Sequence, residues 1–427
     1  MNRSLLSRRS LLKGAFAIGG AAAGSRIAGP FVGNALAATE PSHFVHIFFN
    51  AGLNALGAVL LAAGAADKYV AGNVFDVTSS NIKEVGNGVV TDAATWGTFP
   101  QIALDHWAAV GMKHGVASHT VPNNINGGGE RAILLDGGDS ALTKLAHAMG
   151  GDSAFKAVHF GDRMPAYKQQ PAFQGVSIDR ITSLSDALKS IGAGGSTPAS
   201  TTRADSQAGL EASLALGNAP IAMNPKRLGP LGEAYKAAIA ALKKPERAAS
   251  PVTAADIDKA YGLGGATTVS SFASMLAGAE IMIRGAGTNV VNITDLGFAS
   301  WDFHQVSGGK SQNGFYSRRK FLGEGAFKEN RVALLKTFLD RMLNMEGRNV
   351  VVALSGEMVR LPNGDHGDGT VAALFGKRVK QGVSFGVDAR SRFAPSTPSP
   401  KGFWAACAAA CGVEGQPFGA NPHAVIA

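Results

Sequence analysis

The chain has 427 residues, of which 45% are hydrophobic and 17% are charged, a composition typical of a globular protein with a large core. The formal net charge is +9, but residues 1–38 carry five basic side chains and no acidic one, so the remainder has a charge of only +4. This excess does not indicate nucleic acid as a partner. After residue 38, no stretch is apolar over enough residues to predict a membrane-spanning helix.

The first 38 residues have the three parts of an export signal in order. Arg8 and Arg9 come first, an apolar Gly/Ala-rich stretch follows, and small residues end the segment at Ala38. This order predicts a twin-arginine signal peptide. We therefore expect the twin-arginine export machinery as a partner and a periplasmic or exported location. An uncleaved signal would instead anchor the protein to the membrane.

Residues 39–427 alternate predicted strands with predicted helices. The apolar runs predict strands at 43–49, 111–117, 157–160, 175–178, 289–294 and 350–354, and the helical patterns cover 101–110, 130–135, 272–283, 326–345 and 401–411. Residues 193–260 begin as a Gly/Ser/Thr-rich linker and continue in short Ala/Leu-rich segments, which predicts a helical insertion or cap rather than a separate domain. The alternation predicts an α/β fold with a mostly parallel central sheet, covered by helices on both faces.

Acidic and histidine side chains follow two of these strands. Asp302 and His304 come after strand 289–294, and Glu357, Asp365 and His366 come after strand 350–354. Since the carboxyl ends of parallel strands share one edge of a sheet, we expect these groups to converge there. Carboxylates with imidazoles suit Zn, Mn or Mg, and less readily Ca. The alternative is that the aspartates belong to polar turns.

The loop at 118–129 also follows a predicted strand and precedes a predicted helix. It contains His119, the one further histidine whose position suits the same edge of the sheet. The loop is rich in glycine, so it either presents backbone N–H groups to an anion at the start of the helix or serves as a plain connection.

Several motifs occur in the order found in a known family. Residues 300–304, SWDFH, resemble Gly-Trp-Asp-Thr-His; residues 355–360, SGEMVR, resemble Ser-Glu-Phe-Gly-Arg, with Glu357 and Arg360 at the acid and the arginine; residues 364–367, GDHG, resemble Asp-His-Gly. On these motifs the chain is similar, from about residue 43 to its end, to the exported bacterial proteins grouped as domain of unknown function 1501. That family looks like a branch of the alkaline phosphatase and sulfatase superfamily. The resemblance implies an alkaline-phosphatase-like α/β/α sandwich and metal-assisted hydrolysis of a phosphate or sulfate ester.

Two positions depart from the family pattern. Ala51 stands where a metal-binding aspartate is expected, and Asn126 stands near the position of the nucleophile. An amide cannot form the covalent ester intermediate of the superfamily. Ser118 is a candidate substitute for the nucleophile, and Arg360 is a candidate for stabilising the transferring anion.

Two functions follow from this pattern. The first is an exported hydrolase that acts on a small anionic ester with a divalent metal held by Asp302, His304, Glu357, Asp365 and His366. The second is a catalytically inactive periplasmic binding or assembly protein on the same fold, with a protein partner. The altered positions favour the second function, and the two Asp/His pairs favour the first.

Overall fold

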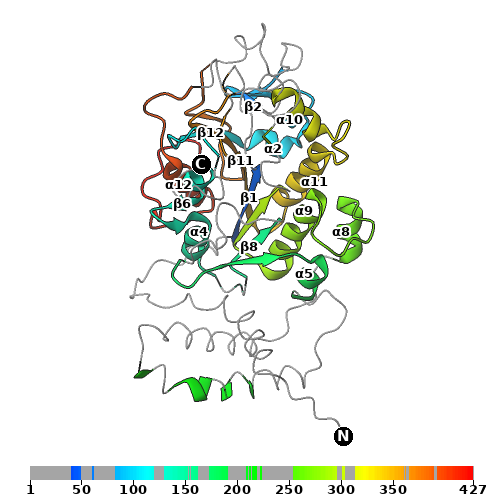
Figure 1. Cartoon of the computed structure of the whole chain (residues 1–427), viewed down its shortest axis with the longest axis vertical. Coiled ribbons are helices and arrows are strands. Elements are labelled where there is room, and N and C mark those ends of the chain that lie inside the picture. The colour runs from blue at the N-terminus through cyan, green and yellow to red at the C-terminus, as the bar shows by residue number, and fades with distance from the viewer. Residues whose placement is uncertain are drawn as a thin grey trace.

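A computed structural model of the chain (Figure 1) describes residues 40–49, 60–61, 82–119, 129–151, 153, 155–161, 173–190, 208–209, 211–212, 214–218, 222–223, 253–295, 301–302, 313–359, 361, 365–388 and 392–426. The predicted signal peptide and most of the predicted insertion at 193–260 lie outside the described residues. Within the described ranges, no helix has the length and apolar character needed to cross a membrane.

An eight-stranded sheet forms the centre of the molecule. Its strands, in spatial order, are β13 (Gly382–Ser384), β5 (Trp107–Lys113), β12 (Gly369–Phe375), β11 (Asn349–Gly356), β1 (Ser42–Phe49), β10 (Val290–Thr294), β8 (Ala157–Phe160) and β9 (Ile178–Ile181). β12 runs antiparallel to both of its neighbours, and the other pairs are parallel. The carboxyl ends of β5, β11, β1 and β10 therefore lie along one edge, and β12 begins at that edge. The predicted mostly parallel sheet is confirmed.

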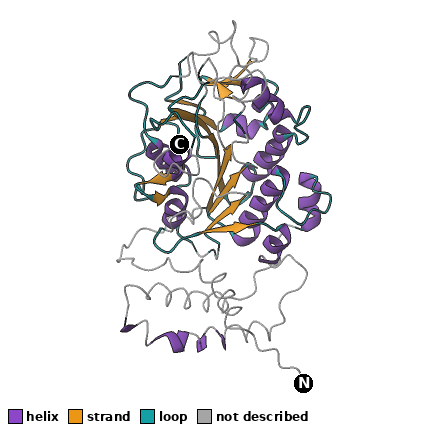
Figure 2. Ribbon diagram, in the orientation of Figure 1, coloured by secondary structure: helices purple, strands orange, loops and turns teal. Residues whose placement is uncertain are grey.

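Helices cover both faces of this sheet, so the fold is an α/β/α sandwich (Figure 2). One face carries α2 (Gln101–Asp105), α5 (Leu184–Ser190), α8 (Ala254–Tyr261), α9 (Phe272–Ile281), the π-helix η4 (Met282–Ala286), α10 (Asn313–Leu322) and α11 (Arg331–Leu343); the other carries α3 (Gly129–Leu134), α4 (Ala141–Met149) and α12 (Pro400–Ala410). In β1, Val45 and Ile47 pack toward the first layer, whereas Phe44 and Phe48 pack toward the second. This alternation is that of a strand buried on both faces.

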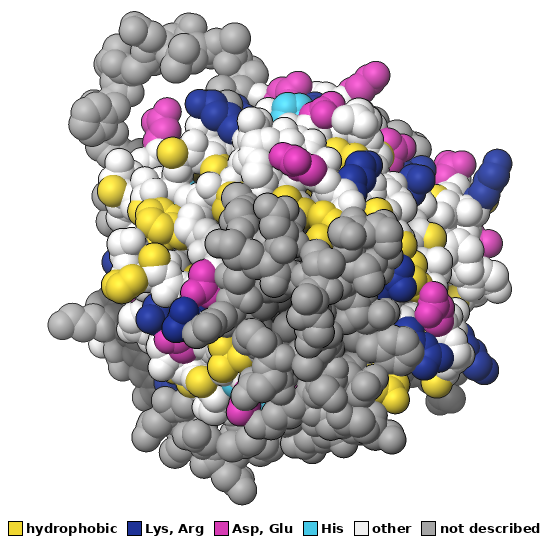
Figure 3. Space-filling model, turned by 90° about the horizontal axis from the view of Figure 1, so that it is seen from above, with side chains coloured by type: hydrophobic (Ala, Val, Ile, Leu, Met, Phe, Trp, Pro, Cys, Tyr) yellow, Lys and Arg dark blue, Asp and Glu magenta, His cyan; other side chains and the backbone are white. Residues whose placement is uncertain are grey.

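Smaller elements lie around the sandwich. They are a three-stranded sheet of β2 (Leu60–Leu61), β4 (Val89–Asp92) and β3 (Ile82–Gly86), a hairpin of β6 (Leu135–Asp136) and β7 (Asp139–Ser140), and the 3-10 turn η3 (Trp96–Thr98). Seen from above, Lys and Arg side chains are interspersed with Asp and Glu over the described part of the surface (Figure 3).

Three predicted elements are placed wrongly: the helix at 101–110, the strand at 111–117, which in the structure is β5 from Trp107 to Lys113, and the strand at 175–178. The helix predicted at 101–110 ends at Asp105, and the strand β5 begins at Trp107. The run from Trp107 to Met112 is apolar enough to suit either structure, and its pairing with β12 and β13 makes it a strand. The strand predicted at 175–178 is displaced, because β9 begins at Ile178. The strand at 157–160 is placed correctly.

Candidate metal centre

Four polar side chains converge at the carboxyl edge of the sheet. His119 follows β5, Asp302 follows β10, Glu357 comes directly after β11, and His366 lies shortly before β12. These strands lie within the run β5-β12-β11-β1-β10. The strand order thus brings together residues that are far apart in the sequence, at the edge where α/β sheets bind ligands.

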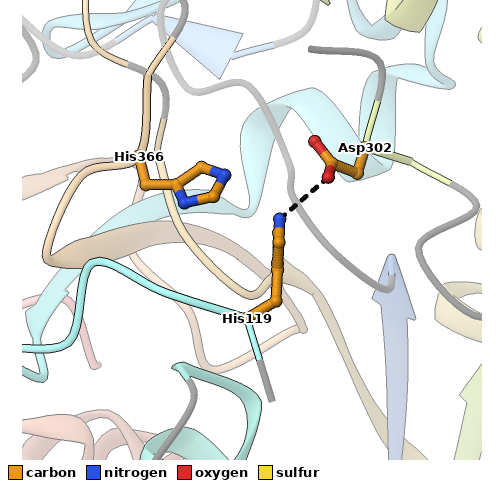
Figure 4. Close-up of side chains that lie close together, drawn as sticks. All are labelled: His119, Asp302 and His366. Atoms are coloured by element: carbon orange, nitrogen blue, oxygen red, sulfur yellow. Dashed lines mark ion pairs between the residues drawn. The ribbon is translucent and has the colours of Figure 1, made fainter. Parts of the chain in front are cut away.

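His119 lies at the middle of this group. Its Nε2 is 3.0 Å from Asp302 Oδ2, and its Nδ1 donates a hydrogen bond of 2.7 Å to Glu357 Oε2. The ring of His366 packs edge-on against it, with 4.4 Å between the ring centroids. One ligand atom from each of His119, Asp302 and His366 lies within 4.8 Å of the other two. Figure 4 shows these three side chains pointing toward one another from separate segments.

The donor set fits a metal ion. Two imidazole nitrogens and one carboxylate oxygen are the protein ligands of many catalytic zinc sites, which keep a fourth position open. Metal–ligand bonds of 2.0–2.1 Å place two ligands of a tetrahedral ion roughly 3.3 Å apart. The 3.0 Å between His119 Nε2 and Asp302 Oδ2 is close to this spacing, and the ligand atom of His366 lies within 4.8 Å of both partners. The group could therefore hold a metal ion.

The two carboxylates hold a proton on His119. Burial acts to lower the pKa of His119, but the hydrogen bonds to Asp302 and Glu357 and the charges of both carboxylates outweigh burial and raise the pKa to about 9. Only 6% of the Asp302 side chain and 2% of the Glu357 side chain is exposed, so water screens these interactions little. A cation that binds at Nε2 must displace this proton.

Glu357 is positioned to orient His119 rather than to share its ion. Its carboxylate accepts from Nδ1, on the opposite side of the ring from Asp302. A carboxylate behind a ligating histidine fixes the ring and its tautomer, an arrangement that is common in zinc sites. The sequence placed Glu357 among the metal ligands, whereas in the structure it stands behind His119.

Neighbouring groups hold Glu357 in place. His114 Nε2 donates to the Glu357 carbonyl oxygen (2.9 Å), and the Val116 amide donates to His114 Nδ1 (3.1 Å). Burial lowers the pKa of His114, which keeps this ring neutral. A Cβ at Gly129 would lie 2.9 Å from Glu357 Cγ, so the first turn of α3 needs glycine to pack this closely.

A second buried cluster anchors the residue before Asp302. Trp301 Nε1 donates to Asp295 Oδ2 (2.7 Å), and the Arg331 Nε–H donates to the same oxygen (2.8 Å). Burial acts to raise the pKa of Asp295, but the charges of Arg331 and Lys320 outweigh it and lower the pKa. Trp301 is buried and packs edge-on against the ring of Phe49. These contacts fix the start of the segment that presents Asp302.

A backbone ladder presents His366. The Gly367 amide donates to the Val359 carbonyl (2.9 Å), and the Val359 amide donates to the Gly369 carbonyl (2.7 Å). The Asp365 carboxylate accepts from the backbone amide of His366 (2.9 Å) and is not in the group of three whose ligand atoms converge. This contact is the turn role that the sequence left open for Asp365.

The remaining candidates are placed as follows. Ser118 is exposed beside His119, and its carbonyl accepts from the Gly129 amide (3.1 Å). His304 and Arg360 lie outside the described residues, as do Ala51 and Asn126. Of the five predicted ligands, the structure brings Asp302 and His366 together. His119 lies between them and contacts both. The loop position of His119 points to the same edge of the sheet, but the ligand set predicted from the sequence does not include it.

Comparison with other proteins assigns no family. No protein-family model matches the sequence, and no curated protein is significantly similar to it. A crystal structure of Ps i-CgsB in complex with k-i-k-neocarrahexaose aligns with a TM-score of 0.32 and 12% sequence identity, over 90% of this chain and 75% of that chain. A TM-score this low supports neither a family nor an activity, so the function must come from the site itself.

Proposed function

We propose that the chain is an exported hydrolase of phosphate or sulfate esters that binds one divalent cation through His119, Asp302 and His366. The observation that carries this proposal is the convergence of their ligand atoms within 4.8 Å, at the edge where α/β sheets bind ligands. Two imidazoles and one carboxylate favour Zn over Mg or Ca, which prefer oxygen ligands. The resemblance of residues 300–304 and 364–367 to family motifs supports the ester class.

The residues of the chain have separate roles in this proposal. When bound, the cation supplies Lewis acidity toward an ester oxygen. Glu357 keeps the Nδ1–H of His119 turned toward itself, so that Nε2 faces the cation. Three protein ligands leave a coordination position for the substrate. Ser118, exposed beside His119, is the proposed nucleophile, and Arg360 is proposed to bind the anion.

One observation favours the alternative, a catalytically inactive binding or assembly protein. His119 contacts Asp302 and Glu357 at once, and as an imidazolium it satisfies both carboxylates without a metal. In that case the cluster stabilises the three loops that carry these residues and has no role in ester hydrolysis. Metal content separates the two functions.

The first test compares wild type with Asp302→Asn and with a matched control, Asp136→Asn. Asp136 is another largely buried carboxylate, paired with Lys144 of α4 and not part of the candidate ligand group. We expect about one zinc ion per chain in wild type and in the control, measured by mass spectrometry of the purified protein, and loss of the ion in Asp302→Asn. Equal metal in all three proteins would exclude this site.

The second test is hydrolysis of 4-nitrophenyl phosphate and 4-nitrophenyl sulfate. We expect turnover of one of them that a chelator abolishes, zinc restores and Asp302→Asn lacks. If the protein binds zinc at the cluster yet hydrolyses neither ester, the binding protein becomes the better description.

Export is a separate part of the proposal. Replacing Arg8 and Arg9 together by lysine should leave the protein in the cytoplasm, because the twin-arginine pathway reads this pair. Cell fractionation measures the outcome, and a variant that still reaches the periplasm would contradict it.

A further inference from the structure

A hollow lies at the carboxyl end of β13, along the same edge of the sheet as the candidate metal centre. Its volume is about 680 Å³, and it is lined mainly by apolar residues, among them Phe385, Val387, Phe393 and Pro395, with the Asp388–Arg392 ion pair also on its lining. Pockets of this volume accommodate small molecules. We call this hollow the aryl pocket.

Two strands of the central sheet carry a glycine where residues of this pocket pack against them. A Cβ at Gly111 would lie 1.6 Å from the Phe385 carbonyl oxygen and 3.3 Å from Phe393 Cε1. A Cβ at Gly369 would lie 2.7 Å from Phe393 Cε2. Glycine weakens a strand, so a glycine inside one marks a close approach. Here β5 and β12 each carry one where the two aromatic residues meet the sheet.

The backbone of Phe385 is strained. Its φ is 56°, in the left-handed region that a bulky residue rarely adopts. The ring packs edge-on against His423, with 5.5 Å between centroids, and His423 Nδ1 is 2.9 Å from the hydroxyl oxygen of Ser384. Strain of this kind persists where the surroundings impose it, and it is concentrated at binding sites.

The aryl pocket and the candidate metal centre lie at neighbouring strand ends, because β13, β5 and β12 are adjacent in the sheet. Gly369, against which Phe393 packs, is three residues beyond His366, a span of at most about 10 Å. Asp368 lies between His366 and Gly369 along the chain and pairs with Lys113 of β5 (3.3 Å), and both side chains are partly exposed. One elongated molecule can therefore reach both places.

We propose that the aryl pocket binds the aromatic part of the substrate while its ester group lies at the candidate metal centre. The substrate class is then an aryl phosphate or aryl sulfate. This inference rests on the proposed function for the position of the ester. The aryl contact itself depends on Phe385 and Phe393, because aromatic rings attract one another in offset and edge-on arrangements.

The test measures binding of 4-phenylphenol, which carries the aryl group without an ester, by titration calorimetry. Phe385→Gly is the decisive variant. Glycine adopts this φ without steric cost, so we expect the variant to fold. We expect its affinity for 4-phenylphenol to be about two- to tenfold weaker than that of wild type. Phe385→Tyr keeps the ring and should bind as wild type does. Gln174→Gly replaces another residue of positive φ, next to β9 at the opposite edge of the sheet, and should also bind as wild type does.

Two results would overturn the aryl pocket: wild type that does not bind 4-phenylphenol, or Phe385→Gly that binds it as tightly as wild type. A comparison of 4-phenylphenyl phosphate with methyl phosphate, in the presence of zinc, tests the link to the metal centre. We expect the aryl ester to bind wild type more tightly, and Phe385→Gly to reduce this advantage. Equal binding of the two esters by wild type would also overturn the proposal. Aryl binding without hydrolysis of either ester would overturn the proposed hydrolase instead and leave the pocket in place.

Discussion

Two buried histidines of this protein have pKa values on opposite sides of neutrality. His46, in the middle of β1, has its pKa lowered to about 4, whereas His119, at the carboxyl edge, has its pKa raised to about 9. Both rings are largely buried, and burial acts to lower the pKa of both. The difference therefore comes from their partners.

The partners of His46 are uncharged. Its Nδ1–H donates to Asn292 Oδ1 (3.0 Å), and its Nε2 accepts from the Ser355 hydroxyl (2.7 Å). Asn292 in turn donates to His159 Nδ1 (2.9 Å). This chain of side chains crosses four strands, and its three hydrogen bonds form with both rings neutral. The same residue type thus stays neutral in the core when its partners are an amide and a hydroxyl, and holds a proton at the candidate metal centre when they are carboxylates.

The largest effect should come from giving His46 the partner that His119 has. Asn292→Asp places a carboxylate against His46 in the middle of the sheet. We expect the pKa of His46 to rise above 6.5 and the protein to lose about 3 kcal/mol of unfolding free energy at pH 7, because the new charges are buried. The pKa is measured by proton NMR and the stability by urea unfolding.

Asn330→Asp is the matched control for this charge. Asn330 caps α11 at the surface, where its side chain accepts from the Ala333 amide, and aspartate caps a helix equally well. Its stability should stay within about 0.5 kcal/mol of wild type. If Asn292→Asp behaves in the same way, the charge of the partner does not decide the pKa of His46.

Much of the fold could be predicted from the sequence, because strands buried on both faces are continuous apolar runs. β1, β8 and β11 stand out in this way. The boundary between α2 and β5 could not be predicted from the sequence. The segment 107–112 is apolar in either conformation, and only its pairing with β12 and β13 makes it a strand.

The candidate site could be predicted only in part, for a different reason. The rule that sites gather at strand ends identified Asp302 and His366. The central place of His119 depends on β5 lying next to β12 in the sheet, which local sequence does not encode. Glu357 looked like a ligand because residue type alone does not distinguish an acid that binds a metal from one that orients a histidine.

The next effect is a loss of stability in acid. The folded-state pKa of His46 lies below its ordinary value of 6.5. Its contribution is therefore complete above pH 6.5 and is lost as the pH falls from 6.5 to about 4, where only the unfolded chain takes up the proton. One such group contributes about 3 kcal/mol over this range. His43 and His423, whose pKa values burial also lowers to about 4, titrate in the same range.

Urea unfolding at several pH values measures this slope. His46→Gln should lose the part of the acid dependence that comes from His46, so its stability should fall less than that of wild type between pH 6.5 and 4. His119 has the opposite sign in the metal-free protein: its contribution is complete below pH 6.5 and is lost as the pH rises through 9. A wild-type stability that is flat between pH 6.5 and 4 would contradict the neutral state of the buried rings.

A smaller effect should come from making a partner of His119 uncharged. Glu357→Gln keeps the shape of the side chain but removes one of the two carboxylates, so we expect the pKa of His119 to fall. Zinc affinity should fall about 10- to 100-fold, as is typical when the group behind a ligating histidine is lost. Titration calorimetry measures the affinity, with Glu329→Gln as control, a carboxylate that accepts from the first amides of α9. An unchanged zinc affinity would mean that Glu357 does not orient the ligand.

The smallest effect separates burial from hydrogen bonding as the cause of the low pKa of His46. Ser355→Ala removes the hydroxyl that donates to Nε2, which leaves a buried acceptor without this donor and should cost about 1–2 kcal/mol of unfolding free energy. Because burial is the largest cause of the shift, the pKa of His46 should stay near 4 even so. Ser399→Ala, at a helix start where the hydroxyl makes no capping bond, should be neutral. A His46 pKa that rises well above 4 in Ser355→Ala would show that the neutral partner, and not burial, keeps this ring uncharged.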